Sequence, residues 1–132
     1  MTDAVTTETI LRQARELISD PARWTQNAAA RSAHGHPVPV VSPHAIKWCA
    51  IGAIARTIDE LKQSWAAPNV GAAWLTMKAV TNPDQSRLNN CSNAEIATFN
   101  DAASHEDVML VFKHAIEAAI DGTVDDIVAA IA

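Results

Sequence analysis

Residues 46–61 read IKWCAIGAIARTIDEL and form the most apolar helical pattern in the chain. Apolar side chains recur every three to four positions, which is the spacing of one face of a helix. We expect a central helix from about Pro43 to Ser64, because a serine cap (Ser42) followed by proline is a typical helix start. The expected buried face of this helix comprises Ile46, Cys49, Ala50, Ala53, Ile54, Ile58 and Leu61.

Small residues follow one another in the first half of this helix, at Ala50, Gly52, Ala53 and Ala55. A glycine inside a helix costs about 1 kcal/mol relative to alanine. We therefore expect another stretch of backbone to approach the helix closely here.

Helical periodicity recurs on both sides of the central helix. Ser104 and Asp107 are spaced as an acidic helix cap, and so are Ser92 and Glu95. The polar stretch 82–90 is expected to be the most mobile loop. The other expected helices are 7–19, 70–81, 92–100 and 104–122, with a last amphipathic turn or two within 123–131.

Residues 26–41 interrupt the helical pattern. The sequence around Gly35 indicates a turn, and the alternating Pro37 and Pro39 exclude a helix. Proline cannot donate to a central ladder, so any strand here is an edge strand. We expect a short β-hairpin or an extended arm that rests on the helices.

Length and composition fit one mainly α domain over residues 1–132. The 132 residues are 48% hydrophobic, 19% charged and 5% aromatic, which excludes a disordered chain, collagen and a coiled-coil rod. The predicted architecture is a compact bundle of about five or six helices with the short hairpin or arm near 26–41.

Charge and apolar runs restrict the classes of partner. The net charge is -5, and the ten basic residues are scattered singly, so we expect no nucleic-acid partner. Apolar runs are far shorter than the ~18 residues of a membrane span, so we expect no membrane partner. Cys49 and Cys91 form no CxxC pair, and the N-terminus lacks the pattern of an export signal. The sequence therefore predicts a cytoplasmic protein with reduced thiols.

Three motifs occur in order along the chain: DPARWTQ at 20–26, WCAIGA at 48–53, and FND at 99–101 followed by HEDV at 105–108. Together they resemble an uncharacterised family of small bacterial and phage-associated proteins, a domain of unknown function. The resemblance spans residues 11–120. It implies a small helical fold and no particular activity.

Cys49 and His105 are the candidates for enzyme chemistry. A cysteine nucleophile needs an imidazole within hydrogen-bond reach and often a third group that orients the ring, here Asn100 or Asp101. A hydrolase or transferase is one hypothesis. The alternative is that Cys49 is a small core residue, because free cysteine is among the most buried residue types.

Three histidines, His34, His36 and His44, are weak candidates for metal ligands. Structural zinc needs about four closely spaced nitrogen or sulfur ligands, and neither cysteine supplies a second local sulfur. Ordinary polar histidines on a turn explain them as well. We expect no metal and no cofactor.

Binding residues are expected near Asn100, Asp101 and His105 and at the tryptophans. The polar residues either cap helix ends or recognise a ligand. Trp24 and Trp48 are expected to pack the hairpin onto the central helix, with their indole N–H groups bonded to carbonyls. Trp65 and Trp74 lie on either side of Pro68 and Asn69, where the helical pattern is interrupted. They either form an exposed anchor for a partner or belong to the core.

These observations favour a small non-enzymatic module that binds a protein partner or a small ligand. The cysteine-dependent enzyme is the competing hypothesis. A mobile-element or phage-type inhibitor of a host protein is a third. If one helix exposes an apolar face, two copies of the chain can form a homodimer through it.

Overall fold

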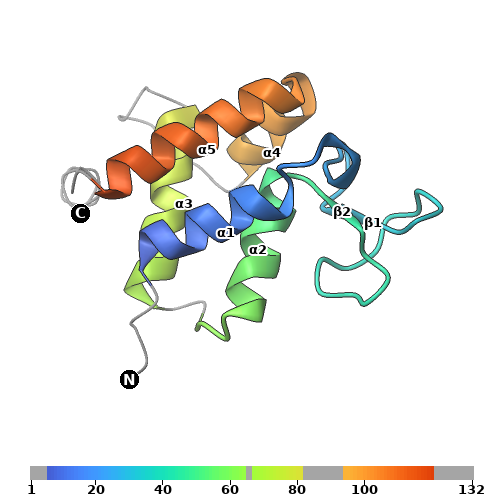
Figure 1. Cartoon of the computed structure of the whole chain (residues 1–132), viewed down its shortest axis with the longest axis horizontal. Helices are drawn as coiled ribbons and strands as arrows, with labels where there is room; N and C mark the ends of the chain where they lie inside the picture. Colours follow the sequence, from blue (N-terminus) through green and yellow to red (C-terminus); the bar gives the residue numbers. More distant parts are fainter. Residues whose placement is uncertain (1–5, 65–66, 82–93, 121–132) are drawn as a thin grey trace.

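The computed structural model describes residues 6–64, 67–81 and 94–120. It confirms the mainly α architecture (Figure 1). The helices are α1 (Thr7–Leu17), α2 (Ala50–Glu60), α3 (Pro68–Thr81), α4 (Ala94–Ala102) and α5 (His105–Ile120), with one 3₁₀ turn, η1 (Pro21–Arg23). The strands are β1 (Ala30–Arg31) and β2 (Lys47–Trp48).

Helix α1 lies at the centre of the packing. It contacts α2, α3 and α5, while α4 packs against α2 and α3. Its start is capped by Thr6, whose hydroxyl accepts from the backbone N–H of Thr9 at 3.1 Å. The core joins the apolar faces of these helices; its fully buried members include Ile10, Leu11, Ile54, Ile58 and Phe112.

The two strands form a short antiparallel ladder, as the hairpin prediction requires. Ala30 lies opposite Trp48, and Arg31 lies opposite Lys47. The second strand lies further along the chain than expected, after the predicted 26–41 region. The segment between the strands, residues 32–46, projects beyond the helical body (Figure 1).

The predicted start of the central helix is wrong. Helix α2 begins at Ala50 rather than near Pro43. The preceding backbone pairs with β1 instead: the N–H of Ile46 donates to Arg31 O at 2.9 Å, and that of Cys49 donates to Ala29 O at 3.1 Å. Ile46 is consequently 42% exposed rather than part of the buried face.

The expected close approach to the small-residue stretch is confirmed at Gly52. A Cβ atom at this position would lie 1.9 Å from the carbonyl oxygen of Ala29. Only glycine therefore allows the backbone before β1 to lie against the first turn of α2. The small residue fixes how the β ladder sits on the helix.

Several sequence-based expectations fall outside the described residues. They are the loop 82–90, the cap at Ser92, the last turns within 123–131, Cys91 and Trp65. Of the helices that are described, none has the length and apolarity needed to cross a bilayer.

Candidate functional site

Asn100, in the last turn of α4, is completely buried and uses both side-chain atoms. Its Oδ1 atom accepts from Trp24 Nε1 at 2.7 Å and from the backbone N–H of Ala50 at 3.0 Å. Its Nδ2 atom donates to Thr25 O at 3.0 Å. One amide therefore connects α4, the chain after η1 and the start of α2.

The side chain of Gln26 lies against the C-terminal end of α4. Its Nε2 atom lies 3.1, 3.2 and 3.0 Å from the carbonyl oxygens of Asn100, Asp101 and Ala103. The last carbonyls of a helix lack partners within the helix, so this amide acts as a cap supplied from a distant segment. Asp101 returns a contact, because its Oδ1 atom accepts from the backbone N–H of Asn27 at 2.7 Å.

The backbone of Asn27 has a left-handed conformation, with φ 64°. Asparagine tolerates this region better than most residues with a Cβ atom. The bond to Asp101 holds the turn in place. Asn100 and Asp101, predicted as binding residues, thus use their side chains to bond residues 24–27 to the end of α4.

His105 begins α5, and its ring is also engaged. The Nε2 atom lies 2.8 Å from the carbonyl oxygen of Ile18, which requires the proton on this nitrogen. The ring meets Trp24 edge to face, with centroids 5.6 Å apart and planes at 61°. His105 therefore links the start of α5 to the end of α1.

Cys49 is the N-cap of α2, not a residue of its second turn. Its Sγ atom accepts from the backbone N–H of Gly52 at 3.3 Å. Burial raises the pKa of the thiol above its ordinary value; nearby Asp101 acts in the same direction, and the backbone N–H groups only partly oppose them. The desolvation effect wins, so the thiol is protonated at neutral pH.

No hydrogen bond joins Cys49 to His105 in the part of the chain that the structure describes. The contacts given above occupy the thiol and the ring separately. A small hollow of about 270 Å³ does lie beside the thiol; it is lined by Asn27, Ala28, Ala29, Cys49, Ile51 and Asp101. The cysteine–histidine hypothesis gains no support from this geometry.

The turn histidines His34, His36 and His44 are exposed between the two strands. Across the described ranges, no group of three or more His, Cys, Asp or Glu side chains is arranged to hold a metal ion. Within those ranges, His34, His36 and His44 belong to no such group.

The tryptophans divide between the core and the site. The indole of Trp48 donates to Val40 O at 3.1 Å, and that of Trp24 to the Asn100 amide. Of the two alternatives for Trp74, its low exposure of 8% fits a core residue rather than an exposed anchor. Helix α3 packs against both α1 and α5, which places this large side chain in the core.

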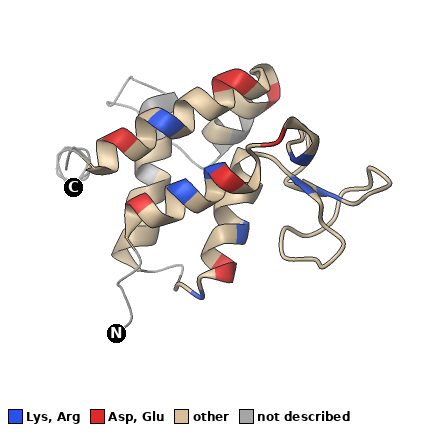
Figure 2. Ribbon diagram, in the orientation of Figure 1, with Lys and Arg blue, Asp and Glu red and all other residues tan. Residues whose placement is uncertain are grey.

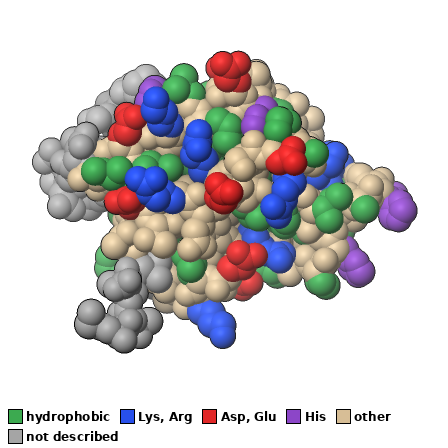
Figure 3. All heavy atoms as spheres, in the orientation of Figure 1, with side chains coloured by type: hydrophobic (Ala, Val, Ile, Leu, Met, Phe, Trp, Pro, Cys, Tyr) green, Lys and Arg blue, Asp and Glu red, His purple; other side chains and the backbone are tan. Residues whose placement is uncertain are grey.

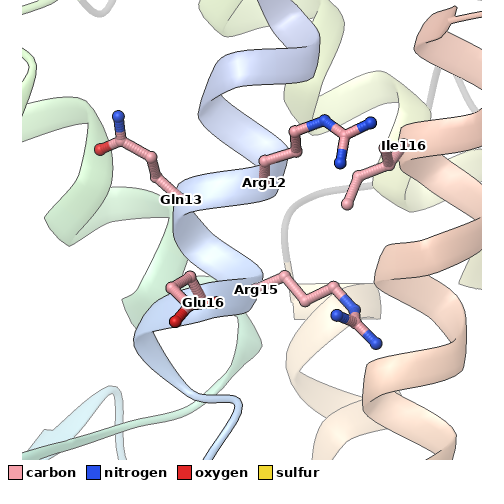
Figure 4. A pocket seen from close by; sticks show the side chains of 5 residues that line it. All are labelled: Arg12, Gln13, Arg15, Glu16 and Ile116. Carbon is pink, nitrogen blue, oxygen red and sulfur yellow. The ribbon is translucent and has the colours of Figure 1, made fainter.

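Arg12 and Arg15 extend from α1 toward α5, with Ile116 on the opposite side of a shallow hollow (Figure 4). The hollow measures about 360 Å³. Arg12 Nε pairs with Glu8 at 2.6 Å, and Arg15 Nε donates to Met109 O at 3.3 Å. The two positive charges of Arg12 and Arg15 are balanced by Glu16 in the lining and by Glu8 beside it, so no single ligand charge is favoured.

The segment 32–46, here called the arm, has no helix and no regular strand, yet two arginines hold it. Arg31 Nη1 donates to Gly35 O at 2.8 Å near its outer turn. Arg56 Nη1 donates to the carbonyls of Val40 and Ser42 at 3.0 and 3.1 Å. The arm is thus fixed by side chains that lie outside it.

The arm also presents apolar side chains to solvent. Val41 is 48% exposed and Ile46 is 42% exposed, although both are large and hydrophobic. Figure 3 shows hydrophobic and histidine side chains side by side on this projection. The apolar spacing of the sequence places Ile46 in the core, and no local pattern in the sequence indicates that Arg31 and Arg56 bond to the carbonyls of the arm.

These features define a small, mainly helical domain with a projecting, side-chain-anchored arm. The chain belongs to the Family of unknown function (DUF6197), whose model matches residues 2–118. This confirms the resemblance to an uncharacterised family. Comparison with curated proteins and with solved structures gave no significant match.

Proposed function

We propose that the protein is a small interaction module whose arm, residues 32–46, docks into a protein partner. The observation that carries this proposal is the combination of a fixed backbone with exposed apolar side chains at Val41 and Ile46. An irregular segment of this length is uncommon in a compact domain, and it is usually functional or disordered. The anchoring hydrogen bonds argue for function.

Anchoring matters because ordering a loop on binding lowers affinity. A segment that is already held in one conformation avoids most of that loss. Trp48 Nε1 and Arg56 Nη1 both donate to Val40 O, at 3.1 and 3.0 Å, so the residue preceding Val41 is held on two sides. The Val41 side chain is therefore presented by a restrained backbone rather than by a free loop.

The test compares proteins recovered from a cell lysate by the native chain and by two matched variants. Val41→Asp places a charge on the arm, and Leu110→Asp places one on α5 at a residue of similar exposure, 47%. We expect a partner that the native chain and Leu110→Asp recover equally and that Val41→Asp loses by about tenfold or more. Equal recovery by all three would contradict the proposal.

The same partner distinguishes the other hypotheses. If it is an enzyme whose activity falls with the native chain but not with Val41→Asp, the module is an inhibitor. If Cys49→Ser abolishes an effect that Val41→Asp leaves intact, the cysteine rather than the arm carries the function. Val41→Asp and Cys49→Ser should both keep the thermal unfolding curve of the native chain.

A further inference from the structure

The stretch of sequence around the arm carries a net positive charge although the protein is acidic. Between Asp20 and Asp59 the sequence has no Asp or Glu. This stretch holds four of the ten Lys and Arg residues and three of the five His. It therefore carries a charge of +4, and the remaining six basic and fifteen acidic residues carry -9. Figure 2 shows the basic residues where β1 and β2 meet.

The fold gathers these four cations at Trp48, where the arm joins the body. Lys47 precedes Trp48 in β2 and lies opposite Arg31 in β1. The guanidinium carbons of Arg23 and Arg56 each lie 5.5 Å from the centroid of the Trp48 ring. Residues from η1, both strands and α2 thus bring four cations to the β ladder: Arg23 and Arg56 lie against the Trp48 ring, and the cross-strand pair Arg31 and Lys47 lies on the opposite face of the strands.

Little of this charge is neutralised within the chain. Arg31 donates only to neutral oxygens, those of Thr25 Oγ1, Gln26 O and Gly35 O, at 3.0, 3.2 and 2.8 Å. Arg56 pairs with a half-exposed Glu60 at 2.8 Å. As far as the structure describes the chain, no carboxylate pairs with Arg23, Arg31 or Lys47.

The register of the ladder places two residues of like charge opposite each other. Like charges directly opposite each other destabilise an antiparallel pair, and Arg31 lies opposite Lys47 in a ladder of only two residue pairs. Arg31 is explained by its bonds to the arm. Lys47 has no carboxylate partner among the residues that the structure describes, so its charge is available to an external anion.

We infer that the surface recognised by the arm is an acidic protein surface: Asp and Glu side chains contact Arg23 and Lys47, and an apolar recess receives Val41 and Ile46. This inference rests on the proposed function and names the chemistry of its partner. A nucleic acid fits less well, because its phosphate backbone offers nothing to the exposed apolar pair.

A display experiment tests the chemistry without a known partner. Short random peptides displayed on yeast are selected on the immobilised native protein and then sorted for loss of binding to Val41→Asp. We expect the peptides that depend on Val41 to be enriched in Asp and Glu together with apolar residues. Lys47→Glu should weaken them at least about tenfold, and the exposed α5 variant Lys113→Glu should weaken them about twofold or less. Raising salt from about 50 to about 300 mM should also weaken them several-fold.

Each other outcome is decisive. The acidic partner is contradicted if the peptides that depend on Val41 are neutral or basic, or if Lys47→Glu does not change their binding. Either result still supports an interaction module that binds through the arm. Absence of any peptide that depends on Val41 would overturn both. Binding of duplex DNA of about 20 base pairs, or of phosphatidylserine vesicles, by the native chain but not by Lys47→Glu would replace the acidic protein with a different anion.

Discussion

The side-chain oxygen of Asn100 accepts a 3.0 Å hydrogen bond from the backbone N–H of Ala50. The first N–H groups of a helix have no partner inside the helix. In α2 they are served from two places, because Cys49 Sγ accepts from Gly52 and Asn100 accepts from Ala50. The same Asn100 oxygen accepts from Trp24, so the start of α2, the segment after η1 and the end of α4 are stabilised together.

We expect Asn100→Ala to lower the free energy of unfolding by about 3 kcal/mol. The substitution leaves the indole of Trp24, the N–H of Ala50 and the carbonyl of Thr25 without their buried partner, and each such loss costs about 1–3 kcal/mol unless water replaces it. Urea unfolding measures the change. Trp24→Phe, which removes only one of these bonds, should cost about 1 kcal/mol.

The double variant checks that the two residues act through each other. The combined loss should be smaller than the sum of the single losses, because both substitutions remove the same bond. Additive losses would show that the Trp24–Asn100 contact contributes little.

Gly52→Ala and Gly71→Ala should change stability in opposite directions, although both place alanine in a helix. The new methyl group at position 52 would overlap the Ala29 carbonyl, a backbone atom that cannot rotate away. At position 71 it meets nothing within 4 Å. Thermal unfolding should show a loss of about 2 kcal/mol or more for the first variant and a gain of up to about 1 kcal/mol for the second. A harmless Gly52→Ala would refute the close approach.

Cys49 should react slowly with thiol reagents at neutral pH. In a Cys91→Ser background only this thiol reports, and its raised pKa together with burial should make alkylation at pH 7 at least about tenfold slower than that of an exposed cysteine peptide. Fast alkylation with a depressed pKa would instead revive the cysteine-dependent enzyme.

The same raised pKa predicts how stability depends on pH. Below about pH 8.5, the ordinary value of a cysteine, the thiol is protonated in both the folded and the unfolded chain, and its contribution is fully present. As the pH rises above that value, the unfolded chain loses its proton first and the free energy of unfolding falls. Cys49→Ser should lack this alkaline decrease, which urea titrations at several pH values will measure.

Arg56→Ala should loosen the arm without unfolding the body. The substitution removes the donor to the carbonyls of Val40 and Ser42. Hydrogen exchange at residues 38–46 should accelerate about tenfold or more while exchange in α1 and α5 stays unchanged. Arg12→Ala removes an exposed pair with Glu8 on α1 and serves as the control, with no change in the arm. Unaltered exchange after Arg56→Ala would show that other contacts hold the arm.

The sequence predicted the helices better than their boundaries. Apolar spacing located α1, α2, α3, α4 and α5, because each buries one face in a common core. The start of α2 was misplaced because Ser42 and Pro43 resemble a helix cap, while the true cap is Cys49. The decisive interaction is the pairing of β2 with β1, and pairing between distant segments leaves no periodicity in a single strand of two residues.

The site shows the same division between local and distant signals. The sequence predicts Asn100, Asp101 and His105 as polar residues between two helices, and the structure places all three at the corner of α4 and α5. Thr25 and Gln26 lie in the DPARWTQ motif at 20–26, but neither they nor Ile18 can be identified from sequence as partners, because a backbone carbonyl or an amide looks the same whether it is used or not. The anchoring roles of Arg31 and Arg56 cannot be predicted from the sequence for the same reason.

The distance along the chain between Ala50 and Asn100 has a consequence for biosynthesis. Fifty further residues must be added to the chain after Ala50 before the Asn100 side chain that accepts from the first turn of α2 exists. A nascent chain that ends before α4 also lacks the carbonyls that Gln26 bonds, and with them the attachment of residues 24–27. The attachment of residues 24–27 to the end of α4 is therefore completed only late in translation, whereas the side chains that hold the arm, those of Arg31, Trp48 and Arg56, are made earlier.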